Sequence, residues 1–261
     1  MASRPMTATS MGIVHVHTNY SHDGRDSLET VRDFSLSRGI AWVGLTDHAE
    51  DLTPDRFEEF VERCDAVSDS RVLLIPGLEF RFAGHPGLHL LALGLSRWIQ
   101  PSTPEEFIGE ARSAASFTIV AHPILCHYKL PRVVSAGIDA IEVWNATYNT
   151  RFLPDPRAIR LLRDARARRG EIVGIAGLDQ HDSRNDRETR VIISANESDP
   201  LTALKAGRFV NAGKTMRFDA TVSMGPVRQA ALTVARWIFD RVEYAHHKLV
   251  SGRAARQAPS E

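Results

Sequence analysis

Short apolar runs alternate with amphipathic segments along most of the chain. The runs are rich in β-branched side chains and are bounded by Gly or Pro, as buried parallel strands are. They occupy residues 12–17, 40–45, 71–78, 89–95, 117–121, 138–144, 171–177 and 190–194. Strands that alternate with helices form a parallel sheet with right-handed crossovers. The pattern therefore predicts an α/β fold, either a barrel or a doubly wound sheet.

Helix-start signals lie between several of these runs. Thr103 is a favourable N-cap residue, and Pro104 and Glu106 after it complete a typical helix start. Ser27 can cap a helix that runs to about Ser37. The same cap-then-proline pair recurs at Thr53-Pro54, Asp155-Pro156 and Asp199-Pro200. We expect a helix to begin at each of these positions.

Apolar residues three and four positions apart predict a long helix near the C-terminus. The series is Val227, Ala231, Val234, Ile238, Val242, Ala245 and Leu249. We expect a main domain over residues 11–222 and a helix over residues 223–251 that packs on it. Loose tails are expected at residues 1–10 and 252–261. Alternatively, the basic side chains on the other face of this helix contact a partner or a membrane surface.

The composition argues against several classes of protein. Lys plus Arg and Asp plus Glu both number 32, so the formal net charge of zero gives no field that favours long nucleic acids or acidic membranes. Only two cysteines are present, Cys64 and Cys126, which argues against a disulfide scaffold and fits a reducing compartment. The first residues lack an apolar core of signal-peptide length, and no run could span a membrane. We expect a cytoplasmic protein and leave its oligomeric state open.

Histidines and carboxylates fall at or next to the ends of the apolar runs. They are His15, His17, Asp23, His48, Glu79, His89, His122, Asp179 and His181. Each one alone has an ordinary explanation, such as a hydrogen-bonded side chain at a strand end or a surface carboxylate. Their joint placement is informative because the carboxyl ends of the strands in an α/β barrel meet at one rim, where active sites lie. We therefore expect these side chains to converge.

The chemistry of such a set is metal binding. Imidazole and carboxylate together suit Mn, Fe or Zn better than Mg or Ca, which prefer oxygen ligands. The set is too large for one ion with about four to six ligands, so we expect two or three divalent ions. Three divalent ions would carry six positive charges, and Asp23, Glu79 and Asp179 would offset three of them. The remaining positive charge suits an anionic substrate such as a phosphate ester.

In chain order, the motifs are His-x-His, Thr-Asp-His, Gly-x-Glu, a later His, Ala-His-Pro and Asp-x-His. This series resembles the PHP (polymerase and histidinol phosphatase) family of metal-dependent phosphoesterases over about residues 11–215. The resemblance implies a distorted (β/α)7 barrel with a trinuclear metal centre. The chain departs from the family where Gly-Ser-Asp-Ala-His is common, because Leu178 and Gln180 stand in place of the Ser and the Ala. The ligand positions survive, but their neighbours differ.

The resemblance also implies which residues hold each ion. The first ion would be held by His15, His17, Glu79 and Asp179. The second would be held by Asp23, His48 and His181. The third would be held by His89 and His122, with Glu79 as a bridge. A hydroxide between the ions, held by Glu79, Asp179 and His181, would attack phosphorus in line with the leaving group.

Two of these positions have a neighbouring candidate. His22 directly precedes Asp23, and we prefer Asp23 for its offset from His17. His85 lies close to His89, and we prefer His89 because it leads straight into an apolar run. Both alternatives stay open on the sequence.

The sequence thus predicts a metal-dependent phosphoesterase that acts on a small phosphate ester, either a monoester or a diester, with nucleotide-like esters included. Candidate substrate-binding residues on the rim loops are His127, Lys129 and Arg184. Residues 141–145, followed by Asn149, resemble a branch of the family that includes carbamate-ester hydrolases. Hydrolysis of a carboxylic or carbamate ester by the same centre is therefore the alternative. A second alternative is a non-catalytic barrel that binds metal.

Overall fold

The computed structural model describes residues 9–150, 152–197 and 199–256. The chain divides into two compact units, Met1–Ser223 and Met224–Glu261. Most of the predicted N-terminal tail, residues 1–8, and half of the predicted C-terminal tail, residues 257–261, lie outside the described residues. Among the described residues, no helix has both the length and the apolar character that a membrane span requires.

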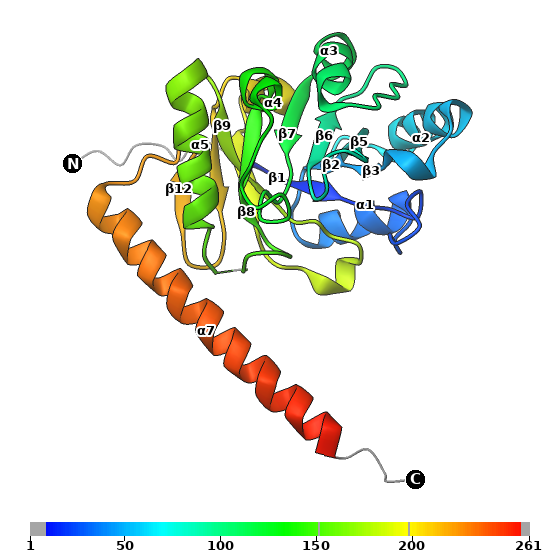
Figure 1. The fold of residues 1–261 in the computed structure, drawn as a ribbon. Coiled ribbons are helices and arrows are strands. Elements are labelled where there is room, and N and C mark those ends of the chain that lie inside the picture. The colour runs from blue at the N-terminus through cyan, green and yellow to red at the C-terminus, as the bar shows by residue number, and fades with distance from the viewer. Residues whose placement is uncertain (1–8, 151, 198, 257–261) are drawn as a thin grey trace, which may run out of the picture. The chain divides into compact units, whose positions relative to one another are not determined.

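The first unit contains two six-stranded sheets (Figure 1). One sheet has the order β12-β11-β10-β1-β2-β4, and the other has the order β3-β5-β6-β7-β8-β9. The strands of the first are β1 (Thr9–Val16), β2 (Trp42–Leu45), β4 (Leu73–Ile75), β10 (Arg190–Ser194), β11 (Phe209–Ala212) and β12 (Arg217–Asp219). Those of the second are β3 (Asp47–His48), β5 (Gly77–Arg81), β6 (His89–Leu93), β7 (Phe117–Val120), β8 (Ala140–Asn145) and β9 (Val173–Gly177).

The two sheets are linked on both sides. On one side β2 continues into β3 after Thr46, and β4 continues into β5 after Pro76. On the other side the chain beyond β9 pairs with β1: Leu178 donates its N–H to the Val14 carbonyl at 2.9 Å, and Gln180 donates to the His15 carbonyl at 3.1 Å. The predicted α/β class is confirmed, and the description as a distorted (β/α)7 barrel stays a prediction with which these links agree.

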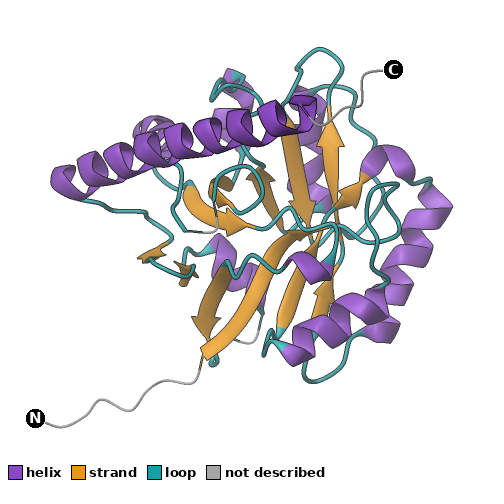
Figure 2. Ribbon diagram, turned by 90° about the horizontal axis from the view of Figure 1, so that it is seen from below, coloured by secondary structure: helices purple, strands orange, loops and turns teal. Residues whose placement is uncertain are grey.

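Helices cover the outer faces of the strands (Figure 2). All the helices predicted from cap residues are confirmed: α1 (Leu28–Ser37), α2 (Pro54–Val67), α3 (Pro104–Ala114), α5 (Pro156–Arg169) and α6 (Pro200–Lys205). In each, the oxygen of the predicted cap side chain accepts a backbone N–H of the first turn, which satisfies a donor that the helix leaves open. A short helix, α4 (Arg132–Gly137), starts at Pro131 without a side-chain cap and was not predicted. Single 3₁₀ turns occur at Ala49–Asp51 and Ser183–Asn185.

The sheets are not wholly parallel, contrary to the expectation from the alternating pattern. β6 runs antiparallel to both β5 and β7, and β10 runs antiparallel to β1. The connection over residues 82–88 is too short for the crossover that a parallel pair requires, which takes roughly a dozen residues or more. As a result His89, at the start of β6, pairs with Arg81, at the end of β5. The reversal therefore brings His89 to the edge where the neighbouring strands end.

The core of the first unit combines both sheets. Buried apolar side chains from the two sheets and from α6 form one cluster: Val14, Trp42, Leu91, Leu93, Phe117, Ile119, Ile175, Val191, Ile193, Leu204 and Phe209 are among its members. Burying this much apolar surface is the main favourable term in folding. It fixes the strands rigidly, so that the side chains at their ends have defined positions.

The second unit is the helix α7 (Pro226–Arg256). The sequence predicted a helix over residues 223–251, and the observed one continues into the segment that was expected to be a tail. The predicted packing of this helix on the main domain stays a prediction.

Candidate metal centre

The predicted histidines and carboxylates lie together at one end of the first unit, where most of the strands that carry them end. His15 lies near the end of β1, His48 ends β3 and Glu79 lies in β5, while His122 and Asp179 follow β7 and β9. Each of these five side chains is at most 5% exposed. The convergence expected from the sequence is therefore observed, and the site is largely shielded from solvent.

Glu79 lies at the middle of the site. Its two carboxylate oxygens are approached by five imidazole nitrogens, at distances between 2.6 and 3.6 Å. The five belong to His15, His17, His48, His89 and His122. A carboxylate with imidazoles on both oxygens has the arrangement that a metal-bridging ligand needs.

Two further carboxylates complete the arrangement. The Asp179 Oδ1 atom lies 3.3 Å from Nε2 of both His15 and His17. The Asp23 Oδ2 atom lies 3.1 Å from His48 Nε2 and 3.2 Å from His181 Nε2. Of the two alternatives, Asp23 and His22, it is therefore Asp23 that lies among the candidate ligands. The His22 ring instead pairs with Asp51 at 2.7 Å and is 61% exposed.

Three overlapping groups have ligand atoms that all lie within 4.8 Å of one another. They are His17, Asp23, His48 and His181; His15, Glu79 and His122; and His15, His17 and Asp179. The groups follow the division implied by the resemblance only in part. His17 also joins the group around Asp23, His15 joins Glu79 and His122, and Glu79 is absent from the group of His15, His17 and Asp179. His89 touches Glu79 at 2.6 Å without joining a group.

Unpaired buried atoms show that these residues fit metal ions. Among the described residues, no hydrogen-bond partner is found for His15 Nε2, for either ring nitrogen of His17, for His122 Nδ1 or for Asp23 Oδ1. Buried polar atoms almost always have a partner, and these ones belong to side chains of the ligand groups. Imidazole nitrogen and carboxylate oxygen are ligands of Mn, Fe and Zn. The donor set therefore suits divalent metal ions.

Carboxylates in this site are held in the charged form. Burial alone would raise the pKa of Glu79, but the neighbouring imidazoles, above all those of His122 and His15, lower it well below its ordinary value. Burial likewise opposes ionisation of Asp179, and the nearby His15 outweighs it and lowers the pKa of that carboxyl. Anionic oxygens at neutral pH are what cation binding requires.

Several of these residues have an unusual backbone. His15, His122 and Asp179 have φ angles of 68°, 21° and 51°, in the left-handed region that non-glycine residues rarely adopt. His15 also sits at a bulge, since the pairing of β1 with β2 shifts between Val14 and Val16. His15 and His17 do face one centre, with ring centroids 5.2 Å apart. They do so through this bulge rather than through the regular alternation of a strand, in which residues two apart share a face.

A buried carboxylate that the sequence did not assign to the site forms hydrogen bonds with two of the candidate ligands. Glu142, on β8, is fully buried, and its Oε1 atom accepts a hydrogen bond from His15 Nδ1 at 2.8 Å. Its Oε2 atom accepts the His122 backbone N–H at 2.7 Å and the Asn145 side-chain amide at 2.8 Å. Gly177 lies so close that any side chain there would overlap this carboxylate. A charged residue within an apolar run was the signal that could have identified it.

A second buried carboxylate fastens the loop that carries Asp23. Asp47 accepts hydrogen bonds from the backbone N–H and hydroxyl groups of Thr18 and Ser21, at 2.7 to 3.1 Å. The Ser21 hydroxyl in turn accepts the His48 backbone N–H at 2.8 Å. Asp47 thereby couples the position of the loop to the strand end that bears His48.

Two side chains beside the centre were not predicted. The Tyr148 ring lies 4.8 Å from the His122 ring, and burial together with the Asp179 carboxylate raises the pKa of its hydroxyl. The Arg81 Nη2 atom lies 3.1 Å from His48 Nε2. Both side chains therefore lie directly beside candidate ligands.

The predicted substrate-binding residues are less closely connected to the site. Arg184 is bound to Asp182 through Nε at 2.9 Å and Nη2 at 2.5 Å, and its side chain is 76% exposed. His127 and Lys129 are exposed on the loop after His122. A role for these three in binding substrate stays a prediction.

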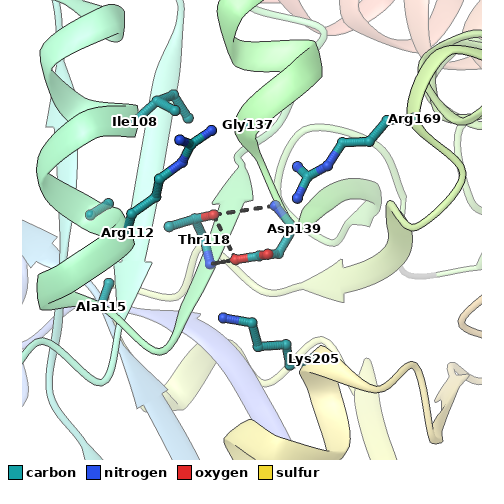
Figure 3. A pocket seen from close by; sticks show the side chains of 9 residues that line it. Ile108, Arg112, Ala115, Thr118, Gly137, Asp139, Arg169 and Lys205 are labelled. Carbon is teal, nitrogen blue, oxygen red and sulfur yellow. Dashed lines mark hydrogen bonds between the residues drawn. The ribbon is translucent and has the colours of Figure 1, made fainter.

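Two hollows in the described part of this unit differ in their relation to the centre. One, of about 320 Å³, adjoins the centre and is lined by Asp23, Asp179 and His181. The other, of about 150 Å³, lies at the opposite ends of β7 and β8, where Asp139 accepts the backbone N–H and the hydroxyl of Thr118 at 3.0 and 2.8 Å (Figure 3). None of the candidate metal ligands lines the second hollow.

Three solved structures are similar to this chain at low sequence identity, and the first two share its fold. PsfC from Pseudomonas syringae is 15% identical, with a TM-score of 0.55, over 90% of this chain and 98% of that chain. An amidohydrolase from Chromobacterium violaceum with bound sulfate is 15% identical, with a TM-score of 0.51, over 76% of this chain and 96% of that chain. A proposed metal-dependent phosphoesterase from Bifidobacterium adolescentis is 16% identical, with a TM-score of 0.49, over 66% of this chain and 88% of that chain. No curated protein matches the chain.

The family is established by a direct match. The profile of the PHP domain matches residues 14–197, well over half of the chain. The matched region includes every candidate ligand from His15 to His181. The resemblance inferred from the order of the motifs is confirmed, and the chain belongs to the PHP domain family.

Proposed function

We propose that this protein is a metal-dependent phosphoesterase that hydrolyses a small phosphate ester. The broader class, a metal-dependent hydrolase, follows from the family and from the clustered ligands. The single observation that carries the proposal is the meeting of three ligand groups around Glu79 in a largely buried site. Such a site is built to hold several cations close together.

The charge of the site favours phosphate over neutral esters. Asp23, Glu79 and Asp179 would offset only half of the charge of three divalent ions, which leaves a positive surplus. In a site shielded from water, that surplus stabilises the charge that develops on phosphoryl oxygens. Bound ions of this kind also lower the pKa of a coordinated water to about 7, so that a nucleophile forms at neutral pH.

The residues of the site have different roles in this proposal. The nine predicted ligands would hold two or three ions, with Mn, Fe or Zn preferred over Mg. Glu79, Asp179 and His181 would position the attacking water. Glu142 would keep His15 in the orientation and tautomer that ligation needs. No serine or cysteine nucleophile is required.

The experiment is a phosphate-release assay with a panel of small phosphate monoesters and diesters, in the presence of Mn or Zn. The metal-supplied protein should release phosphate from at least one monoester or cleave one diester. Asp179→Ala should abolish turnover because a ligand is lost, whereas Asp164→Ala, at an exposed position of α5, should turn over normally. Near-normal turnover by Asp179→Ala would remove that residue from the site, and no turnover of any ester by the wild type would refute the proposal.

A second candidate is the hydrolysis of a carboxylic or carbamate ester by the same centre. It is favoured by the resemblance of residues 141–145 to the branch of the family that includes carbamate-ester hydrolases. Adding aryl esters and carbamates to the same panel separates the two, because the preferred substrate would then lack phosphorus. A non-catalytic metal-binding role would leave every compound intact.

A further inference from the structure

We propose that the hollow beside the metal centre binds a second anionic group of the substrate, a carboxylate or another phosphate, through Arg25 and Arg187. This inference rests on the proposed function, since it adds to the phosphate ester a charged group at the far end of the molecule. It makes the substrate class a phosphate ester with at least two anionic ends.

The hollow is continuous with the centre. Its volume of about 320 Å³ lies within the range of small-molecule sites. Its lining includes the candidate ligands Asp23, Asp179 and His181, and also Arg25 and Arg187. A molecule whose phosphoryl group reaches the ligands can therefore extend into the part that the two arginines line.

The backbone of Arg25 is fixed next to the centre. Its N–H donates to the carbonyl of the ligand His181 at 2.9 Å. The guanidinium is 71% exposed, and its nearest carboxylate is that of Asp182, at 3.7 Å. Arg25 is thus held at the site by its main chain, while its side chain is free to meet a ligand.

Arg187 lies on another wall of the hollow. Its Nη1 atom donates to the Ala146 carbonyl at 3.3 Å. The next residue, Thr147, donates its hydroxyl to the carbonyls of Leu178 and Asp179, both at 3.0 Å. Among the described residues the Arg187 guanidinium contacts this carbonyl and pairs with no carboxylate. Its position is therefore tied to the segment that bears Asp179, and its charge is unmatched.

The charges around the hollow leave the two arginines in surplus. Apart from the candidate ligands, the only carboxylate in the lining is Asp182. That carboxylate already accepts three hydrogen bonds from the Arg184 guanidinium, at 2.5 to 3.1 Å. Arg25 and Arg187 thus face the hollow without full compensation. Guanidinium groups bind carboxylate and phosphate through two parallel hydrogen bonds, so such an anion is the group that would fill this space.

The test is a binding measurement that does not depend on catalysis. Three non-hydrolysable probes share a three-carbon frame and one phosphonate, and differ at the far end: propylphosphonate has a methyl, phosphonopropionate a carboxylate, and propane bisphosphonate a second phosphonate. Their dissociation constants are measured by calorimetry with the metal-loaded full chain. The variants are Arg25→Gln, Arg187→Gln and the double variant. Arg163→Gln, an exposed position of α5 outside the hollow, is the matched control.

One or both probes with two anionic ends should bind wild type about tenfold or more tightly than propylphosphonate, since a charge-assisted hydrogen bond is worth roughly a factor of ten. The double variant should lose this preference and the control should keep it. The second anion is identified by the probe that gains more affinity over propylphosphonate, the one with the carboxylate or the one with the second phosphonate. Equal affinity for all three probes, or a preference that survives in the double variant, would overturn the inference. If the preference is present but no ester is hydrolysed, the proposed function fails and this binding site stands.

Discussion

The support that Glu142 gives to the metal centre can be tested with a single isosteric change, Glu142→Gln. In the wild type one carboxylate oxygen accepts from His15 Nδ1, and the other accepts from the His122 backbone N–H and the Asn145 amide. A glutamine has only one accepting oxygen. Because two donors lie on the side of His122 and Asn145, we expect the glutamine oxygen to stay there and its NH₂ group to face His15.

That arrangement reverses the hydrogen bond to the histidine. The NH₂ group can only donate, so His15 Nδ1 must become the acceptor and the ring proton moves to Nε2. Nε2 is the atom that lies 3.3 Å from Asp179 and 3.6 Å from Glu79, where an ion would bind. Ligation then requires either the unfavourable tautomer or a broken hydrogen bond. The loss of such a supporting carboxylate costs about 10–100-fold in metal affinity, or about 1.4–2.7 kcal/mol.

The assay is a calorimetric titration of metal-free protein with Mn or Zn, which gives the affinity for each equivalent of metal that binds. Glu142→Gln should weaken at least one equivalent by about 10–100-fold, with a far-ultraviolet spectrum like that of the wild type. Glu171→Gln, at an exposed position, should bind as the wild type does. Wild-type affinity for every equivalent in Glu142→Gln would show that the tautomer of His15 is not set by this carboxylate, and would refute the reasoning.

Two further predictions concern protonation and an unpaired amide. Burial lowers the pKa values of His15 and His48, but neighbouring carboxylates outweigh burial and raise them in the metal-free protein. Metal binding must displace these protons, so the metal affinity should fall as the pH decreases through the raised pKa values. Calorimetric titrations with metal near pH 7 should therefore give different heats in two buffers of different ionisation enthalpy. Equal heats in the two buffers would contradict this. The Gln180 side chain is 5% exposed, and neither of its amide atoms has a hydrogen-bond partner among the described residues. A buried unpaired polar group costs about 1–3 kcal/mol, so Gln180→Met should unfold at the same or a higher temperature, and a clear decrease in the melting temperature would indicate that the amide has a partner.

Much of the local structure could be predicted because it depends on neighbouring residues. A cap residue followed by proline specifies a helix start within one turn, and helices begin where Thr53, Thr103 and Asp155 predicted them. The candidate ligands could be predicted for a similar reason, since polar side chains at the ends of apolar runs stand out. Their order along the chain then indicated the family.

Features that depend on distant contacts could not be predicted. The direction of β6 follows from a short connection rather than from any pattern within the strand, and it is this direction that brings His89 to the site. The role of Glu142 depends on His15, which lies 127 positions away in the sequence. Arg25 and Arg187 could not be singled out from the sequence, because only the fold brings them to one hollow.

The most direct test of the account is the metal content of the purified protein after incubation with Mn, Fe or Zn and removal of the excess. The clustering of imidazoles and carboxylates around Glu79 predicts about two to three equivalents per chain. It also predicts that Glu79→Gln lowers this number, because the ions share that carboxylate. A metal content of less than about one tenth of an equivalent per chain would contradict the claim that these side chains hold a cluster of cations.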